Sequence, residues 1–197
     1  MAKNDKMEMD NSGVNQGVMV WNNQGNIQLT LSETKKIPSL ISMIVKSLGE
    51  NCSDENMPDS SEALTVYKPD EKIEYNCVFR YKYVIKEYSA YFTYCDNVLD
   101  IYDNSNVGSK ARILRCIHMW YLEKKGNLIS SLKDADKEEI EIIRENSDYL
   151  IDRVKERILN VINRSDISGT YIEDIETGVA YFVCYCFIEC KILEKPV

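Results

Sequence analysis

The sequence predicts a mainly α-helical protein, an antiparallel bundle of about four helices preceded by a β-hairpin and one further helix. Two observations support this fold class. Hydrophobic residues recur at steps of three and four through much of residues 71–197, which is the spacing of one face of an α-helix. A short stretch within residues 13–31 instead alternates hydrophobic and polar residues, and a period of two is typical of a half-buried β-strand.

Length, charge and cysteine content limit the functional class. The chain has 197 residues, 44% of them hydrophobic, which is enough to bury the core of one domain and an appendage. Its formal net charge of -8 disfavours a general nucleic-acid binder, because such proteins neutralise phosphates with a basic surface. The 7 cysteines show no disulfide framework and the chain starts without a secretory signal, so we expect reduced thiols and a cytoplasmic location.

The first 31 residues divide into a tail and a hairpin. Residues 1–12 are polar and predict a disordered tail. Residues 13–31 predict a β-hairpin, because Asn-Gln-Gly supplies turn residues at 15–17 and again at 23–25. Two strands are only marginally stable alone, so the hairpin either packs on its own helical body or pairs with another chain. If it pairs with another chain, the candidate partner-binding residues are Trp21, Ile27 and Leu29.

A helix and a linker follow the hairpin. Residues 32–49 predict a helix that Ser32 or Thr34 caps and that Gly49 ends. Residues 50–70 contain Asn, Ser, Asp and two prolines but few large apolar residues, which predicts a linker or a long surface loop. We place the main domain boundary in this linker, and the helical bundle domain in residues 71–197.

One long helix is predicted to organise the bundle, from Lys72 to Tyr102. Its apolar positions follow one another by three and four residues without a slip: Val78, Tyr81, Ile85, Tyr88, Phe92, Cys95, Leu99 and Tyr102. This 3.5-residue period is what a helix needs to run alongside another helix. Neither Pro nor Gly interrupts the stretch, so we expect one continuous helix about 45 Å long.

Tyrosine is enriched in this stretch. The chain has 13 tyrosines, and seven of them lie between Tyr75 and Tyr102. A tyrosine buries a large ring while its hydroxyl can stay in water, which suits surfaces that are covered only in a complex. A second apolar row runs along the same helix at steps of seven and includes Tyr91. We therefore expect Tyr91 and Tyr94 to contact a partner.

Three more helices complete the predicted bundle. The second, Lys110 to about Leu132, carries the basic residues, and the third starts near Asp136 with an acidic stripe expected to face away from the core. The last, Tyr171 to about Leu193, is apolar nearly all round and should be the most buried. Its uncharged run of about a dozen residues is shorter than the roughly 20 that span a bilayer, so we expect no membrane insertion.

The candidates for chemistry are few. The single histidine, His118, lies two positions after Cys116, so the two side chains point to different sides of a helix and cannot act as a nucleophile–base pair. Cys184, Cys186 and Cys190 cluster without the paired Cys-x-x-Cys spacing of a structural zinc site. We therefore predict no catalytic residues, no metal site and no cofactor.

Two alternative functions remain open. The spacing Glu-x-x-Glu at 138–141 and at 173–176 puts paired carboxylates on one helix face, as in all-α magnesium-dependent nucleotide hydrolases. The second helix carries one basic cluster, made of Lys110, Arg112 and Arg115 with Lys124 and Lys125, and an adaptor could bind nucleic acid through Lys110, Arg112 and Arg115. For each group we favour the simpler interpretation: a solvent-exposed acidic face, and ion pairs between the basic cluster and the acidic third helix.

Residues 67–127 resemble the helical C-terminal modules of bacterial ABC-three-component conflict systems. The similarity lies in Lys-Ile-Glu-Tyr-Asn at 72–76, Gly-Ser-Lys at 108–110 and Tyr-Leu-x-x-Lys-Gly at 121–126. In those systems a small helical module tethers an effector to an ABC-type ATPase. The resemblance therefore implies protein partners, such as an ABC-type ATPase and an effector, and provides no catalytic motif. Because no nuclease or other toxic domain precedes the module, we expect a non-enzymatic adaptor subunit of an anti-phage defence complex.

Overall fold

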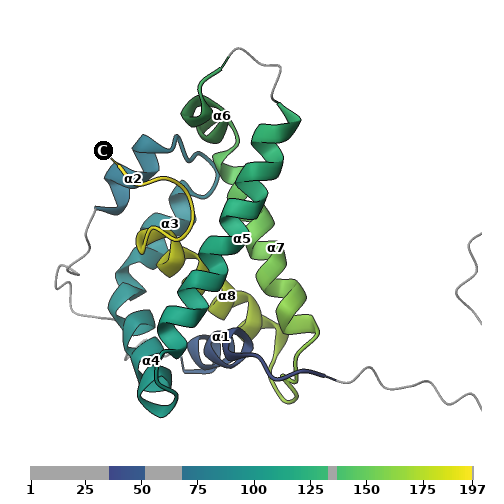
Figure 1. Ribbon diagram of the computed structural model, residues 1–197. Helices are drawn as coiled ribbons and strands as arrows, with labels where there is room; N and C mark the ends of the chain where they lie inside the picture. The colour runs from purple at the N-terminus through teal and green to yellow at the C-terminus, as the bar shows by residue number, and fades with distance from the viewer. Residues whose placement is uncertain (1–35, 52–67, 133–136, 197) are drawn as a thin grey trace, which may run out of the picture. The chain divides into compact units, whose positions relative to one another are not determined.

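The computed structural model describes residues 36–51, 68–132 and 137–196, and this part is mainly helical without β-strands (Figure 1). The predicted tail and hairpin, and with them Trp21, Ile27 and Leu29, lie outside the described residues. The α-helices are α1 (Leu40–Glu50), α2 (Pro69–Tyr75), α3 (Lys82–Tyr88), α4 (Phe92–Ser105), α5 (Ser109–Ser131), α6 (Glu139–Glu145), α7 (Ser147–Asn163) and α8 (Ile172–Ile188). A 3₁₀ turn, η2 (Ser89–Tyr91), joins α3 to α4.

Helix α8 is the core of the described region. Every residue from Tyr181 to Ile188 is buried, and α8 packs against α1, α3, α4 and α7. The prediction that the last helix is the most buried is therefore confirmed. The helix ends at Ile188 rather than near Leu193, since Cys190 and Leu193 have φ angles of 54° and 63°, which no α-helix accommodates.

Helix α1 packs against α8 at two glycines. A Cβ atom on Gly178 would lie 2.1 Å from the Val45 carbonyl oxygen, and a Cβ on Gly49 would lie 1.9 Å from the Asp174 carbonyl oxygen. The two backbones therefore approach more closely than any other residue type would allow. The described residues from 36 onwards belong to one compact unit.

The start of α1 differs from the prediction. The helix begins at Leu40, because the Ser39 hydroxyl accepts a hydrogen bond from the Ser42 N–H (3.3 Å) and caps the first turn. The predicted caps, Ser32 and Thr34, lie outside the described residues.

The single long helix predicted for residues 72–102 is wrong. The stretch contains α2, a turn, α3, η2 and α4, and the first break includes Cys77 with a φ angle of 52°. The apolar stripe nevertheless faces the core: Val78, Ile85, Phe92, Cys95 and Leu99 are buried, and Tyr81, Tyr88 and Tyr102 are half-buried. The spacing thus predicted the buried face but not the breaks in the backbone.

Helices α5 and α7 lie side by side and antiparallel (Figure 1). The second predicted helix is confirmed as α5, but the third divides into α6 and α7 at Asn146. The acidic stripe of the third helix does not face wholly into solvent. Asp148 accepts hydrogen bonds from the N–H groups of Arg80 (2.8 Å) and Tyr81 (3.1 Å), so it ties α7 to the start of α3.

Candidate partner-binding groove

A buried lysine holds the segment that follows α8, residues 189–196, which we call the C-terminal segment. Lys72 is 1% exposed, and its Nζ donates hydrogen bonds to the carbonyl oxygens of Phe187 and Ile192, the second at 2.8 Å. Nζ also lies 4.5 Å from the centre of the Phe187 ring. Burial lowers the pKa of Lys72 to about 8, because desolvation disfavours the charged form.

A buried asparagine fixes the same segment one helical turn further along. Asn76 is 0% exposed; its Nδ2 donates to the carbonyl oxygens of Lys72 (3.0 Å) and Glu194 (2.9 Å). Its Oδ1 accepts a hydrogen bond from the Glu194 N–H (3.0 Å). Both backbone polar groups of Glu194 are thus satisfied by one side chain. Lys72 and Asn76 together keep the C-terminal segment in place.

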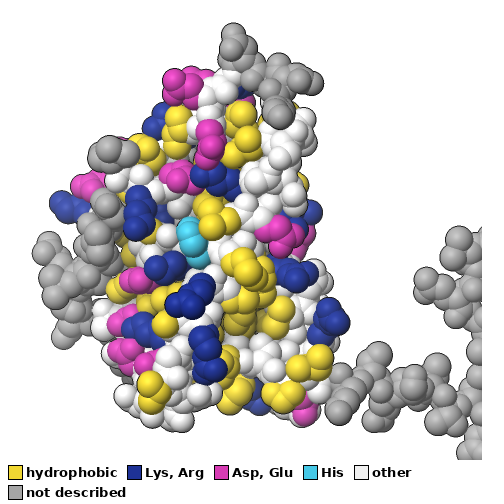
Figure 2. All heavy atoms as spheres, viewed as in Figure 1, with side chains coloured by type: hydrophobic (Ala, Val, Ile, Leu, Met, Phe, Trp, Pro, Cys, Tyr) yellow, Lys and Arg dark blue, Asp and Glu magenta, His cyan; other side chains and the backbone are white. Residues whose placement is uncertain are grey.

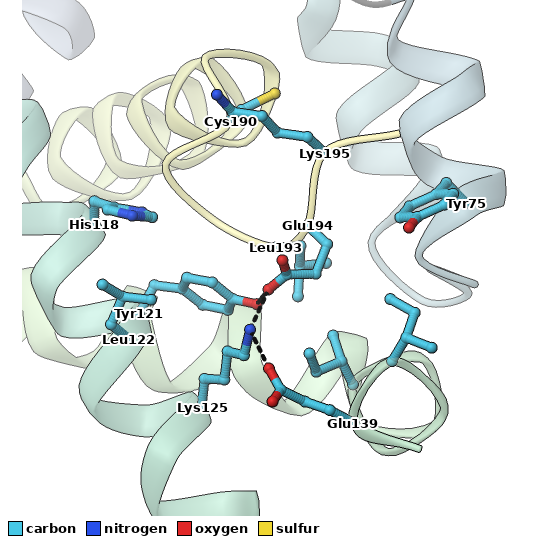
Figure 3. Close-up of a pocket in the computed structure, with 12 residues that line it drawn as sticks. Tyr75, His118, Tyr121, Leu122, Lys125, Glu139, Cys190, Leu193, Glu194 and Lys195 are labelled. Carbon is cyan, nitrogen blue, oxygen red and sulfur yellow. Dashed lines mark hydrogen bonds and ion pairs between the residues drawn. The ribbon is translucent and has the colours of Figure 1, made fainter. Parts of the chain in front are cut away.

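The side chain of Glu194 connects the C-terminal segment to α5 (Figure 3). Its Oε1 accepts hydrogen bonds from the Tyr121 hydroxyl (2.6 Å) and the Lys125 ammonium (2.9 Å). Lys125 also pairs with Glu139 of α6 at 2.6 Å. Partial burial opposes ionisation of Glu194, but the hydrogen bonds from Tyr121 and Lys125 outweigh it and lower the pKa of this carboxyl.

A groove runs between α5 and the C-terminal segment, and we call it the α5 groove. It consists of two cavities of about 490 and 550 Å³, and His118 lines both. From α5 the cavities are lined by a stripe at steps of four and three: Ala111, Arg115, His118, Leu122 and Lys125. The stripe is about 21 Å long at 1.5 Å per residue.

The opposite wall of the α5 groove comes from the C-terminal segment. Lys191 lines the larger cavity, while Cys190, Leu193, Glu194 and Lys195 line the smaller one. His118 Nδ1 lies 3.2 Å from the Lys191 carbonyl oxygen and so joins the two walls between the cavities. Because Lys72 and Asn76 hold this wall from behind, the groove is preformed.

Charge is unevenly distributed along the groove. The larger cavity is lined by Lys110, Arg115 and Lys191 but only one carboxylate, Asp103. Asp96 and Asp100 pair with Lys110 at 2.8 and 2.6 Å, whereas Arg115 and Lys191 form no ion pair within the described residues. Figure 2 shows the single histidine with Lys and Arg side chains gathered below it, over the N-terminal half of α5. In the smaller cavity, two lysines balance two glutamates.

The structure places the predicted tyrosines against the protein's own core. The Tyr91 ring is half-buried and lies 4.7 Å from the Tyr181 ring. The Tyr94 hydroxyl donates hydrogen bonds to the carbonyl oxygens of Ser47 (3.2 Å) and Leu48 (3.3 Å) at the end of α1. Both residues thus have intramolecular roles, and their contact with a partner stays a prediction.

The basic cluster forms intramolecular ion pairs and hydrogen bonds that differ from those the sequence predicts. Lys110 binds α4, and Arg112 donates a hydrogen bond to Asn106 Oδ1 (3.0 Å) at the end of α4. An ion pair with the predicted third helix is present within the described residues between Lys125 and Glu139. Arg115, one helical turn after Arg112, lines the larger cavity of the groove.

One of the two glutamate pairs caps a helix, and the other lies on the surface. Glu138 and Glu141 form the capping box of α6, in which Glu141 Oε2 accepts a hydrogen bond from the Glu138 N–H (3.2 Å). Glu173 and Glu176 are exposed near the start of α8. Among the described residues, no group of three or more His, Cys, Asp or Glu side chains is placed to hold a metal ion.

The cysteines of α8 are buried thiols. Burial raises the pKa of Cys184 to about 12 and that of Cys186 well above its usual value. A thiol that stays protonated is a poor nucleophile and a poor metal ligand, so these residues act as small apolar side chains in the core.

Comparison of the chain with models of known protein families, with curated protein sequences and with solved structures finds no match. Within the described ranges 36–51, 68–132 and 137–196, no helix has both the length and the apolarity to cross a membrane.

Sequence reasoning did not assign the residues that form the groove wall. The sequence pattern predicts no such role for Lys72, Asn76 or Glu194, although Lys72 and Asn76 lie in a stretch that carries the resemblance. One signal was available, since two polar residues four positions apart share a helix face, next to the buried Ile73. Their targets are more than a hundred positions away, which no local pattern indicates.

Proposed function

We propose that this protein is a non-enzymatic adaptor that binds another protein through the α5 groove. The observation that carries the proposal is the preformed groove itself. Its α5 wall is one regular helical stripe, and its second wall is fixed from behind by Lys72 and Asn76. A preformed site binds a partner at a small entropic cost, because few groups must be ordered when the complex forms.

An exposed apolar side chain lies inside the groove. Leu122 is 48% exposed although it lines the smaller cavity beside Ile140 and Ile143. A partner that covers Leu122 would remove apolar area from water, at about 25 cal/mol per Å². This site supports association rather than catalysis.

The resemblance to ABC-three-component systems supports a particular assembly. We propose that the partners are other subunits of a bacterial anti-phage defence complex, with the adaptor coupling an ABC-type ATPase or a sensor to an effector. The positions that carry the resemblance include Lys72 and Asn76, which hold the groove wall, and Tyr121, Leu122 and Lys125, which line the groove.

A co-purification experiment tests the proposal. The full chain with an affinity tag is expressed in its own host as wild type and as Leu122→Asp, and the native mass of each complex is measured. We expect a defined complex with the wild type and its loss with Leu122→Asp, because a buried unpaired carboxylate opposes binding.

The matched control is Ile101→Asp. Ile101 is an exposed apolar residue of α4 (64% exposed) that lines neither cavity. This variant should retain the complex. Equal loss of the complex in both variants, or no complex with the wild type, would contradict a role for the groove in assembly.

A further inference from the structure

We propose that the segment bound in the α5 groove is acidic, with carboxylates at Arg115 and Lys191 and an apolar side chain on Leu122. This inference deepens the proposed function and rests on it. It specifies the chemical character of the bound segment, which the proposed adaptor function leaves open.

The first argument is the charge of the larger cavity. Arg115 is exposed, Lys191 is half-buried, and within the described part of the chain neither has a carboxylate partner. The one carboxylate that lines this cavity, Asp103, accepts a hydrogen bond from the Lys110 N–H at 2.9 Å. Two cations therefore remain available in a chain whose formal net charge is -8. Cations that line a groove without carboxylate partners favour acidic groups on the segment that binds there.

The second argument is the order of groups along α5. Reading from the N-terminal end of the stripe, a small residue (Ala111) and a cation (Arg115) precede His118 and then an apolar residue (Leu122). The stripe continues to Lys125, whose charge Glu139 and Glu194 already neutralise. A bound segment thus meets an excess of positive charge at one end of the groove, whereas at the other end Leu122 lies among lysines and glutamates that balance in number.

The third argument is the shape of the site. Two cavities that share His118 extend over about 21 Å along the helix, which is longer than a single small anion requires. A continuous protein segment occupies such a groove better, either as a helix or in an extended conformation. The charge and the shape together select an acidic segment with apolar residues.

Selection from a random peptide library on the purified full chain tests this inference. Peptides of about fifteen residues are long enough to span the groove as a helix. We expect the enriched peptides to combine Asp or Glu with a large apolar residue. Their affinity should fall about tenfold or more when Arg115→Glu and Lys191→Glu are combined, because attraction becomes repulsion.

The control combines Lys36→Glu and Lys68→Glu, which reverse the same number of charges at two exposed residues that line neither cavity. Binding of the enriched peptides to this variant should stay within about twofold of wild type. The inference is overturned if no peptide is enriched, if the enriched peptides have no acidic excess, or if they bind the Arg115→Glu/Lys191→Glu variant as tightly as wild type. Neutral peptides that bind wild type but not Leu122→Asp would overturn the acidic inference alone and leave the adaptor function in place.

Discussion

The interface between α1 and α8 and the contact between α2 and the C-terminal segment stabilise the same unit in different ways. At the first, Gly49 and Gly178 let two helix backbones touch, and buried Ile44, Val45 and Leu48 surround them. At the second, Lys72 and Asn76 satisfy backbone groups of α8 and the segment that follows it. One interface depends on close packing, and the other on a few directional hydrogen bonds.

The difference shows why the groove lies where it does. A close-packed apolar interface leaves no polar group and no space for a ligand. Hydrogen bonds from Lys72 and Asn76 instead hold the C-terminal segment from one side only, so its other side remains available as a groove wall. Irregular backbone can form this wall because its buried carbonyl oxygens have partners.

The largest effect is expected at the glycine contact. Gly178→Ala places a methyl group 2.1 Å from the Val45 carbonyl oxygen, so the helices must separate. We expect the free energy of unfolding to fall by about 3 kcal/mol, at the upper end for overpacked cores. Chemical denaturation measures this value.

Gly126→Ala is the matched control for that substitution. A Cβ at Gly126, within α5, meets no atom within 4 Å. Alanine should therefore stabilise the helix there, by about 0.5–1 kcal/mol. If Gly178→Ala instead gained as much stability as Gly126→Ala, helix propensity would outweigh packing, and the α1–α8 contact would not require a glycine.

The next largest effect concerns Lys72. Lys72→Met leaves the buried carbonyl oxygens of Phe187 and Ile192 without their donor, which should cost about 2 kcal/mol at pH 7. The effect should depend on pH. In the folded state the pKa is about 8, below the usual 10.5, so between these values the unfolded chain binds more protons and stability rises with pH.

Denaturation of wild type and Lys72→Met from pH 8 to pH 10 isolates this contribution. The difference between their unfolding free energies should grow by about 2 kcal/mol over that range. Taking the difference removes the titration of thiols and tyrosines that both chains share. A difference that stays constant over this pH range would show that burial does not shift the protonation of Lys72.

A smaller effect is expected at the contact between α7 and α3. Asp148→Ala removes the acceptor of the Arg80 and Tyr81 N–H groups, so unfolding should require about 1 kcal/mol less. Asp148→Asn keeps one acceptor oxygen and should lose about half as much. Equal losses would indicate that the charge of Asp148, and not its hydrogen bonds, stabilises the start of α3.

The smallest effect is expected inside the groove. Leu122→Ser replaces a side chain that is 48% exposed, and we expect the free energy of unfolding to change by less than about 0.5 kcal/mol. Thermal or chemical denaturation provides the measurement. A loss above about 2 kcal/mol would mean that Leu122 belongs to the core, and the groove would no longer be a surface prepared for a partner.

The sequence by itself determined which faces of the chain are buried. The stripe from Val78 to Leu99 faces the core, α5 covers nearly the residues predicted, and the apolar last helix is the centre of the fold. Each of these features depends on the spacing of hydrophobic residues within one segment. Such spacing is local, so it can be recognised in the sequence without knowledge of the tertiary structure.

Only the tertiary structure decided where helices break and which polar groups form the groove. Lys72 and Ile192 lie 120 positions apart, and Asn76 and Glu194 lie 118 apart. The break after α2 follows from these contacts, since Asn76 satisfies the backbone of a distant segment and Cys77 then turns the chain with a φ angle of 52°. A buried hydrogen bond depends on which two segments meet, and that is a property of the folded chain alone.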